Sequence, residues 1–397
     1  MQGGILVDIV IVLLALLFAI NGYRQGFIIG ALGFAGFFGG ALIGVQIAPL
    51  LVEVSEAPAA RVLIALLVVF GIAMLGQWGG SALGVRLRKR VKNDNAKRFD
   101  EFGGALVSMV AVLLVAWVVA APLASSGMPG LAAAVRNSAI VRTIDENMPG
   151  PAQNVYNALR SAVNTNGFPE VFSGLDPSDS PPVDPPDPEL ANSKVVRDAE
   201  ASVLRVSGDA PQCDRHIEGS SFVYDADRDL VLTNAHVVAG TESVSVAGAD
   251  GDVEARVVVF DDRRDLAVLY APGLNAPELD TLDEAAESGA DTIVLGYPQG
   301  GPYTATASRV REHREVTGPD IYDSGEVTRE VYSLRSQVRS GNSGGPLISA
   351  DGDVYGVIFA AAVDDPDTGY AVTMDEARPI MEEGQTTTES VSTKGCT

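Results

Sequence analysis

Apolar residues are concentrated in the first third of the chain, in four stretches separated by short polar segments. The stretches cover about residues 5–20, 27–48, 62–83 and 102–121. Each is close to the roughly 20 residues that a helix needs to cross the hydrocarbon core of a bilayer. Only Asp8, near the start of the first stretch, places an acidic or basic residue in their interiors. The pattern predicts four transmembrane helices rather than a soluble helical domain.

The loops between these stretches predict the orientation of the helices. The first stretch lacks the basic leader of a cleavable signal peptide, so we expect the anchor to stay attached. The segment between the third and fourth stretches is strongly basic and holds Arg86, Arg88, Lys89, Arg90, Lys92, Lys97 and Arg98. The positive-inside rule places this segment in the cytoplasm. Everything after about residue 122 is then exported.

Glycines at positions 36, 40 and 44 fall on one face of the second stretch. This spacing favours close helix packing, either within the chain or against a second copy. A transporter is poorly supported, because no stretch carries the central ionisable pair that marks an ion path.

Charge is distributed as unevenly as hydrophobicity. The chain of 397 residues has 28 Lys and Arg against 51 Asp and Glu, a net charge of −23, although 47% of its residues are hydrophobic. Residues 1–122 hold nine basic and six acidic residues, so the remainder carries −26. Such an acidic body argues against nucleic acid as a partner, because phosphate binding requires clustered Lys and Arg. It favours a hydrated exported region anchored in a lipid bilayer.

The exported region begins with a linker. Helix-like patches occur around residues 131–144 and 155–163, and a proline-rich run covers residues 176–188. Proline fixes φ and removes hydrogen-bond donors, so this run predicts an extended, semi-rigid spacer that is also a candidate cleavage site.

From about residue 191 the pattern changes to short β-branched runs separated by Gly, Asp and Pro, which predicts an all-β barrel or sandwich. Candidate strands are residues 202–206, 221–224, 230–233, 244–246, 253–260, 266–270, 292–295 and 354–359. We divide the chain into a membrane module of residues 1–122, a linker of residues 123–190 and a β domain of residues 191–397. The β domain is long enough for two small barrels.

The two cysteines, Cys213 and Cys396, both lie in the part predicted to be exported. An oxidising compartment favours a disulfide between them, with two free thiols as the alternative. Their spacing excludes a CxxC redox or zinc site, and we expect no metal and no cofactor.

A serine and a histidine occur in contexts that suit nucleophilic catalysis. Ser343 lies in the segment SGNSGGPL, whose glycines let backbone N–H groups converge beside the hydroxyl. Serine is a poor nucleophile without an adjacent base. His236 directly follows an apolar run and is the candidate base.

A carboxylate must orient such a histidine and stabilise its imidazolium form. Asp265 fits this role, because it stands at the start of the apolar run LAVL. Asp261 and Asp262 are competitors, but they lie in the preceding turn and we expect them to face solvent. The order His, Asp, Ser is that of the chymotrypsin-type arrangement.

Three segments that carry these residues resemble the signature blocks of chymotrypsin-fold serine proteases, especially the bacterial trypsin-like and HtrA-like branch. They are residues 233–238 (TNAHVV), 265–269 (DLAVL) and 341–347 (GNSGGPL). Residues 296–300 (GYPQG) resemble the same branch. The first part of the chain is similar to colicin V production proteins. The full length resembles the actinobacterial membrane-anchored acid-resistance serine proteases.

The resemblance implies two six-stranded antiparallel β-barrels with the site between them, attached to a four-helix transmembrane module. It implies that His236 is the general base and acid, Asp265 its orienting partner and Ser343 the nucleophile. The N–H groups of Gly341 and Ser343 would form the oxyanion hole, and Cys213 would pair with Cys396. The implied substrates are proteins or peptides outside the membrane, with the linker itself as a candidate.

The sequence departs from the family pattern in two places. Too few residues follow Ser343 for a PDZ domain, so regulation through one is not expected. A preference for Lys or Arg uses an Asp six residues before the nucleophile, where this chain has Gln337. We therefore expect an uncharged P1 side chain, and a pocket wall that includes Gly356, Val357 and Ile358.

The two remaining histidines, His216 and His313, are expected to be exposed. An alternative to hydrolysis is a membrane scaffold or signalling protein whose protease-like domain binds polypeptides but is latent. The oligomeric state does not follow from the sequence.

Overall fold

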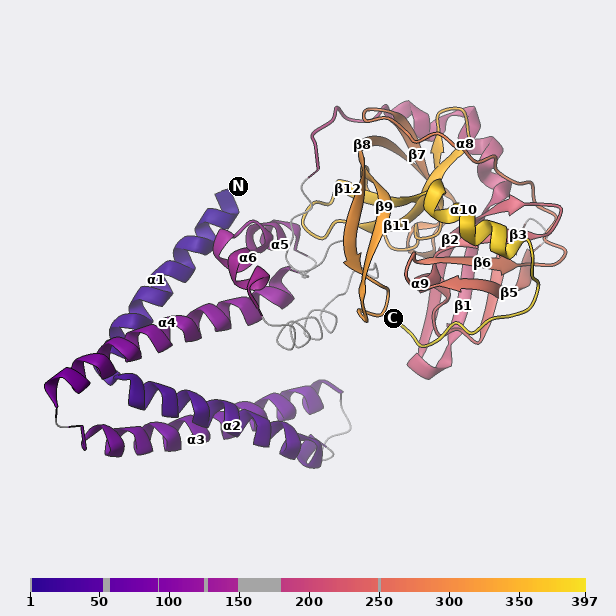
Figure 1. The fold of residues 1–397 in the computed structure, drawn as a ribbon. Coiled ribbons are helices and arrows are strands. Elements are labelled where there is room, and N and C mark those ends of the chain that lie inside the picture. The colour runs from indigo at the N-terminus through magenta and orange to yellow at the C-terminus, as the bar shows by residue number, and fades with distance from the viewer. Residues whose placement is uncertain (1, 53–57, 92, 125–127, 149–179, 249–250) are drawn as a thin grey trace. The chain divides into compact units, whose positions relative to one another are not determined.

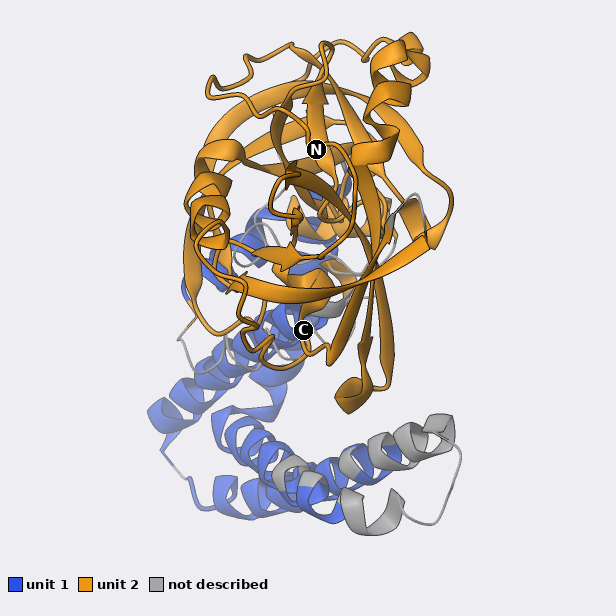
Figure 2. Ribbon diagram, turned by 90° about the vertical axis from the view of Figure 1, so that its right-hand side faces the viewer, with its two compact units in different colours: residues 1–120, 138–147 blue, residues 121–137, 148–397 orange. Residues whose placement is uncertain are grey.

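The chain forms two compact units (Figures 1 and 2). The computed structural model describes residues 2–52, 58–91, 93–124, 128–148, 180–248 and 251–397. One unit contains residues 1–120 and 138–147, and the other contains residues 121–137 and 148–397. The first is helical, and the second contains all of the β-strands. The helical patch predicted around residues 155–163 lies outside the described residues.

The helical unit contains four long helices. They are α1 (Gln2–Gln25), α2 (Phe27–Val52), α3 (Pro58–Arg88) and α4 (Asp94–Ala124). Among the described residues, Gly3–Gln25 and Asp94–Ala120 are long and apolar enough to cross a membrane, and Phe27–Gly40 is a shorter apolar helix. These helices indicate a membrane anchor. The prediction of four spans stays a prediction.

Glycines allow α2 and α3 to approach each other closely. A Cβ on Gly36 would overlap the main chain of Gly76, and one on Gly40 would lie 2.5 Å from the carbonyl oxygen of Ile72. The glycine face of the second apolar stretch therefore packs within the chain, which answers the question that the sequence left open.

Polar contacts join the ends of the long helices. Arg88 donates hydrogen bonds to the carbonyls of Arg24 and Gln25. It also forms an ion pair with Asp100 at 2.7 Å. Asp100 in turn accepts a hydrogen bond from the Ile28 N–H. The turn between α1 and α2 is thus fixed to the connection between α3 and α4.

At the other end of α1, Asp8 caps a short helix. Residues 131–144, predicted as one helical patch, form two helices, α5 (Pro129–Arg136) and α6 (Ala139–Glu146). Asp8 accepts hydrogen bonds from the Ser138 hydroxyl and from the N–H groups of Ala139 and Ile140. The one acidic residue of the first apolar stretch therefore accepts hydrogen bonds from the free N–H groups at the N-terminus of α6.

The β domain consists of two closed six-stranded barrels (Figure 1). The first has the order β1-β2-β3-β6-β5-β4. Its strands are β1 (Val203–Ala210), β2 (Arg215–Asp225), β3 (Leu230–Thr233), β4 (Ser243–Gly248), β5 (Gly251–Asp261) and β6 (Leu266–Tyr270). All pairs are antiparallel.

The second barrel repeats this order as β7-β8-β9-β12-β11-β10. Its strands are β7 (Asp291–Gly296), β8 (Thr304–Pro319), β9 (Glu326–Arg335), β10 (Pro346–Ser349), β11 (Val354–Ala361) and β12 (Thr368–Thr373). The hydrophobic pattern of the sequence does not predict β8, β9, β10 or β12. The first two form a long hairpin whose outer face is charged, so their apolar alternation is weak.

Helix α10 (Met374–Gly384) follows β12 and contacts strands of both barrels. Shorter helical turns connect the strands. They are η1 (Pro188–Asn192), α8 (Lys194–Ala199), η2 (Glu200–Ser202), η3 (Pro211–Cys213), α9 (Ala235–Val238) and η4 (Pro298–Gly300).

The end of the predicted spacer is docked on the second barrel. Ser180 hydrogen bonds to Ser333, and Arg311 donates to the carbonyl of Pro181. Arg335 donates to the carbonyl of Val183. Strands β8 and β9 therefore hold these linker residues. The contacts with the β domain begin before residue 191, where the composition of the sequence predicts that the domain starts.

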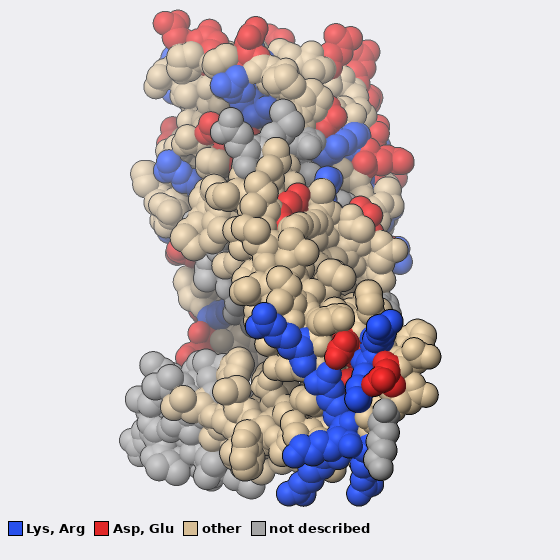
Figure 3. Space-filling model, turned by 90° about the vertical axis from the view of Figure 1, so that its left-hand side faces the viewer, with Lys and Arg blue, Asp and Glu red and all other residues tan. Residues whose placement is uncertain are grey.

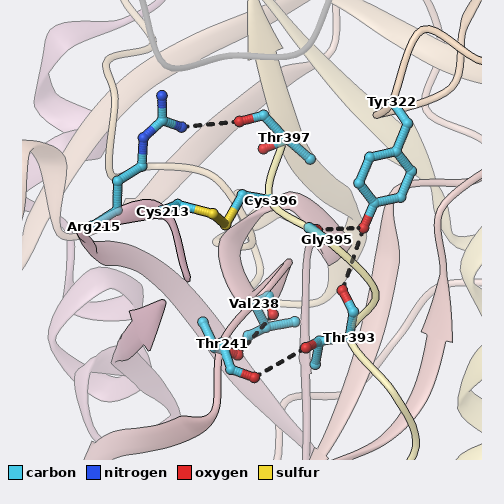
Figure 4. Close-up of a disulfide and its surroundings, with 9 residues drawn as sticks. All are labelled: Cys213, Arg215, Val238, Thr241, Tyr322, Thr393, Gly395, Cys396 and Thr397. Carbon is cyan, nitrogen blue, oxygen red and sulfur yellow. Dashed lines mark hydrogen bonds between the residues drawn. A yellow bond between two sulfur atoms is a disulfide. The ribbon is translucent and has the colours of Figure 1, made fainter. Parts of the chain in front are cut away.

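Cys213 and Cys396 form a disulfide that fixes the C-terminal segment to the first barrel (Figure 4). The same segment is held by main-chain bonds from Gly240 to Thr393 and from Val391 to Val257. It reaches Gly240, only four residues beyond His236 in the sequence.

Candidate active site

The turn that carries His236 lies against the turn that carries Asp265. His236 is in α9, directly after β3, and Asp265 immediately precedes β6, which pairs with β3. Asp265 Oδ1 accepts from the His236 N–H at 2.9 Å, and Oδ2 lies 2.7 Å from His236 Nδ1. Because an ionised carboxylate only accepts, Nδ1 carries the proton and Nε2 is left as an acceptor.

The Asp265 carboxylate is completely buried, and its backbone has φ 60°, a left-handed conformation that is uncommon for a non-glycine residue. Two side chains hold this turn. Asn234 Nδ2 donates to the Asp265 carbonyl at 2.7 Å, and Arg329 Nε donates to the Arg263 carbonyl at 2.6 Å.

Arg329 extends from β9 of the second barrel and is only 2% exposed. It also donates to the carbonyl of Pro319. Burial lowers the pKa of the Arg329 guanidinium, while the nearby carboxylates of Asp265 and Asp320 favour its charged form. Arg329 thus places a buried positive charge near Asp265.

Ser343 lies in the tight turn before β10, and glycine lets this turn approach the histidine turn. Gly344 has φ +83°, and a Cβ there would overlap Thr233 Oγ1 and lie 3.1 Å from the Asn234 nitrogen. Gly219 in β2 lies between the two turns, because its Cβ would be 2.6 Å from Val237 and 3.2 Å from the Ser343 carbonyl. The fold therefore brings Ser343 beside the segment that carries His236.

In the Ser343 turn, the carbonyls of three consecutive residues accept hydrogen bonds, which fix the orientation of their peptide groups. The Ser340 carbonyl accepts from the Gln299 N–H at 2.7 Å, the Gly341 carbonyl from the Ser220 hydroxyl at 2.6 Å, and the Asn342 carbonyl from the Gly345 N–H at 2.9 Å. Within the described chain, the N–H groups of Gly341 and Ser343 donate no hydrogen bond. Both remain available to a ligand.

The Ser343 hydroxyl makes no hydrogen bond to any described residue, His236 included. Such a bond is often long without substrate and tightens when substrate binds. The Ser343 side chain is therefore positioned by its backbone, through the bond from the Ser220 N–H to the Ser343 carbonyl at 2.8 Å.

The competing carboxylates do not reach His236. Asp261 pairs with Arg264 at 3.0 Å, and Asp262 pairs with Lys394 at 2.6 Å. The expectation that both simply face solvent is wrong, because their side chains are only 17% and 22% exposed.

The residues predicted to form a specificity pocket fall in two places. Gln337 is exposed and donates to Asp367 at 3.2 Å. Gly356, Val357 and Ile358 lie in β11, where the Ile358 main chain exchanges hydrogen bonds with the 344–345 segment. Beside Gln337, the buried Val338 packs on Gly369, whose missing side chain makes room for it.

The other two histidines each face a carboxylate. His216 Nδ1 lies 2.7 Å from Asp209, and the His216 side chain is exposed. His313 Nε2 lies 2.8 Å from Glu330, and His313 is exposed as well, so the expected exposure of both histidines is confirmed. No group of metal-binding side chains occurs among the residues that the structure describes.

Sequence reasoning missed Ser220, Asn234 and Arg329. Asn234 lies within the histidine block and could have been singled out there. Ser220 and Arg329 lie outside the recognised blocks, and only tertiary contacts reveal what they hold.

Comparisons with known proteins agree with this architecture. Residues 219–357 match the family model of the trypsin-like peptidase domain, and residues 7–149 match that of colicin V production proteins. The fold is thus that of trypsin-like serine proteases, and the protein is a serine endopeptidase.

A closer relationship is seen with serine protease Rv3671c of Mycobacterium tuberculosis, which is 40% identical over 93% of both chains. The crystal structure of its protease in the active form is 43% identical, covers 57% of this chain and 99% of that one, and gives a TM-score of 0.54. The putative serine protease HhoB of Synechocystis is 33% identical over 41% of this chain and 39% of its own. The chain belongs to the family of the serine protease Rv3671c (MarP).

Proposed function

We propose that the protein hydrolyses peptide bonds through an acyl-enzyme on Ser343. His236 removes the hydroxyl proton through Nε2 and later donates it to the leaving amine, while Asp265 stabilises the imidazolium form. The N–H groups of Gly341 and Ser343 stabilise the oxyanion. The observation that carries this proposal is the pair of hydrogen bonds from His236 to the buried Asp265, beside the Ser343 turn.

Hydrolysis of labelled casein by the full chain in detergent tests these roles. Ser343→Ala should reduce the rate to background, and Asp265→Asn should reduce it by about 10³- to 10⁴-fold, because the wrong histidine tautomer forms. Asp262→Asn is the matched control and should leave the rate within about twofold. Equal rates for Asp265→Asn and Asp262→Asn would refute the triad.

We propose that four helices span the bilayer and that the protease lies on the exported side. Basic side chains gather at one end of the helical unit, where Arg88 joins the two helix connections (Figure 3). The Asp8 contact joins the start of α1 to the segment after α4. Both ends of the four-helix segment would then lie on the exported side, opposite the basic end.

A membrane-impermeant fluorophosphonate distinguishes the two orientations. Right-side-out vesicles should label at Ser343, and inverted vesicles should label only after detergent is added. Labelling in the opposite pattern would place the protease in the cytoplasm. Ser343→Ala is the blank for both preparations.

Membership in the Rv3671c family supports a role in envelope stress or acid resistance, with exported proteins or the chain's own linker as substrates. Gln337 in place of an acidic residue favours an uncharged P1 side chain. Complementation of a deletion strain in acidic medium tests the physiological role. The intact chain should restore growth and Ser343→Ala should not, and equal growth would favour the scaffold alternative.

A further inference from the structure

Ser220 lies in β2 of the first barrel, 121 residues from the glycine whose carbonyl it binds. Its side chain is completely buried. The hydroxyl donates to the Gly341 carbonyl at 2.6 Å and accepts from the Tyr297 N–H at 2.8 Å. The Ser220 N–H donates to the Ser343 carbonyl at 2.8 Å. One residue therefore fixes both ends of the segment from Gly341 to Ser343.

The direction of the Gly341 carbonyl matters because a trans peptide is planar and its C=O and N–H point in opposite directions. The peptide between Gly341 and Asn342 is held at both ends, since the Asn342 N–H donates to the Arg339 carbonyl at 2.9 Å. Rotation of this peptide would change φ and ψ on either side of it. The N–H groups of Gly341 and Ser343 belong to the two flanking peptides, which meet this peptide at the Cα atoms of Gly341 and Asn342. Holding this peptide in place therefore restricts the φ and ψ angles that set the directions of both N–H groups.

Residues of the GYPQG segment complete the arrangement. Gln299 has φ 57°, and its N–H donates to the Ser340 carbonyl. The Tyr297 N–H supplies the hydrogen bond that orients the Ser220 hydroxyl. The Ser220 oxygen thus accepts from one loop and donates to the other.

Resting on the proposed function, we propose that Ser220 is a positioning residue for the oxyanion hole, and that its hydroxyl keeps the N–H groups of Gly341 and Ser343 directed at the reacting carbonyl. The hydroxyl does not touch substrate. It acts through the Gly341 carbonyl, so its loss should weaken stabilisation of the oxyanion more than binding of substrate.

The neighbouring residue provides a matched control. Ser221 is also completely buried, and its hydroxyl donates to the Leu204 carbonyl at 3.2 Å. Successive side chains of a strand point to opposite faces. Ser221→Ala therefore removes a buried hydroxyl from the same strand without touching the Ser343 turn.

The test measures covalent labelling of the full chain in detergent by a fluorophosphonate, whose phosphonyl oxygen occupies the place of the oxyanion. Ser220→Ala should lower the limiting rate of labelling by roughly tenfold or more, with the half-saturating concentration within about twofold of the parent. Affinity for phenylboronic acid should fall in parallel. Ser221→Ala should keep both parameters near those of the parent even where its melting temperature falls.

A limiting rate for folded Ser220→Ala within about twofold of the parent would overturn the proposal, as would an equal loss in Ser221→Ala. Should Ser220→Ala fail to fold, Ser220→Cys retains a weak donor. Its limiting rate should be at least about threefold below the parent, and a parent-like rate would overturn the proposal. If the parent chain itself forms no adduct on Ser343, the proposed function fails rather than the role of Ser220.

Discussion

Asn234 Nδ2 donates a hydrogen bond of 2.7 Å to the main-chain carbonyl of Asp265, a residue whose backbone has φ 60°. The left-handed conformation turns the chain sharply between Arg264 and β6. The same turn directs the carboxylate at both the main chain and the ring of His236. The neutral side chain of Asn234 therefore holds Asp265 in the position from which its carboxylate orients His236.

Asn234→Ala should destabilise the fold by about 1–3 kcal/mol, because it removes the donor to a buried carbonyl. Displacement of Asp265 should also lower casein hydrolysis by roughly ten- to a hundredfold. Urea unfolding and the hydrolysis rate measure the two effects. The exposed Asn192 is the control, and a variant as active as Asn192→Ala would show that Asp265 keeps its place without this bond.

Gly344→Ala should destabilise the protease domain and abolish activity. Gly344 has φ +83°, which costs an alanine about 1–2 kcal/mol, and the new Cβ would also overlap Thr233 Oγ1. Gly325→Ala is the control, because its Cβ would meet nothing nearer than 3.7 Å. Thermal unfolding of both variants checks the effect, and equal melting temperatures would contradict it.

The two cysteines should contribute to stability through the C-terminal segment. Replacing both Cys213 and Cys396 by Ser should lower the free energy of unfolding by about 2–4 kcal/mol, below the roughly 5 kcal/mol that chain entropy allows for so long a loop. The hydrogen bonds of Thr393 and Val391 hold part of the segment without the disulfide. Reductant should lower the melting temperature of the parent and leave that of the double variant unchanged. A melting temperature of the double variant that falls with reductant would show that the disulfide is not the source of the effect.

Asp320 should make stability depend on pH in the acidic range. Burial alone would raise the pKa of its carboxyl, but hydrogen bonds from Ser324 and from the Tyr322 N–H, together with the charge of Arg329, lower it below 3.8. A lowered folded-state pKa stabilises the fold above roughly pH 4, and this stabilisation is lost as the pH falls through the folded value.

The measurement for Asp320 compares urea unfolding of the parent and Asp320→Asn at about pH 6 and about pH 3. The variant should be the less stable at the higher pH, and the difference should narrow at the lower one. The exposed Asp227 provides the control substitution to Asn. A difference that is constant with pH would show that ionisation of Asp320 is not its cause.

Much of the first barrel could be predicted from the sequence, because its strands are short apolar runs bounded by turn residues. The hairpin of β8 and β9 could not, since charged residues such as Arg311, Arg314 and Glu330 occupy its exposed or half-buried positions. The hydrophobic pattern of a segment predicts a strand only where apolar residues alternate with polar ones. The pairing of the charged strands β8 and β9 is therefore seen only in the folded sheet.

The candidate site divides in the same way. His236, Asp265 and Ser343 could be named because each lies in a distinctive local segment. The contacts that fix them come from elsewhere: Ser220 acts from the opposite barrel, and Arg329 reaches from β9 to the turn before Asp265. These are buried hydrogen bonds to main-chain carbonyls, which leave no signature in the order of residues.

The most direct test of the central claim is to treat the intact chain with a fluorophosphonate and map the modified peptide. A single adduct on Ser343, absent from Ser343→Ala and formed much more slowly by His236→Ala, is the predicted result. No adduct on a folded chain, or an adduct of undiminished rate in His236→Ala, would contradict the account.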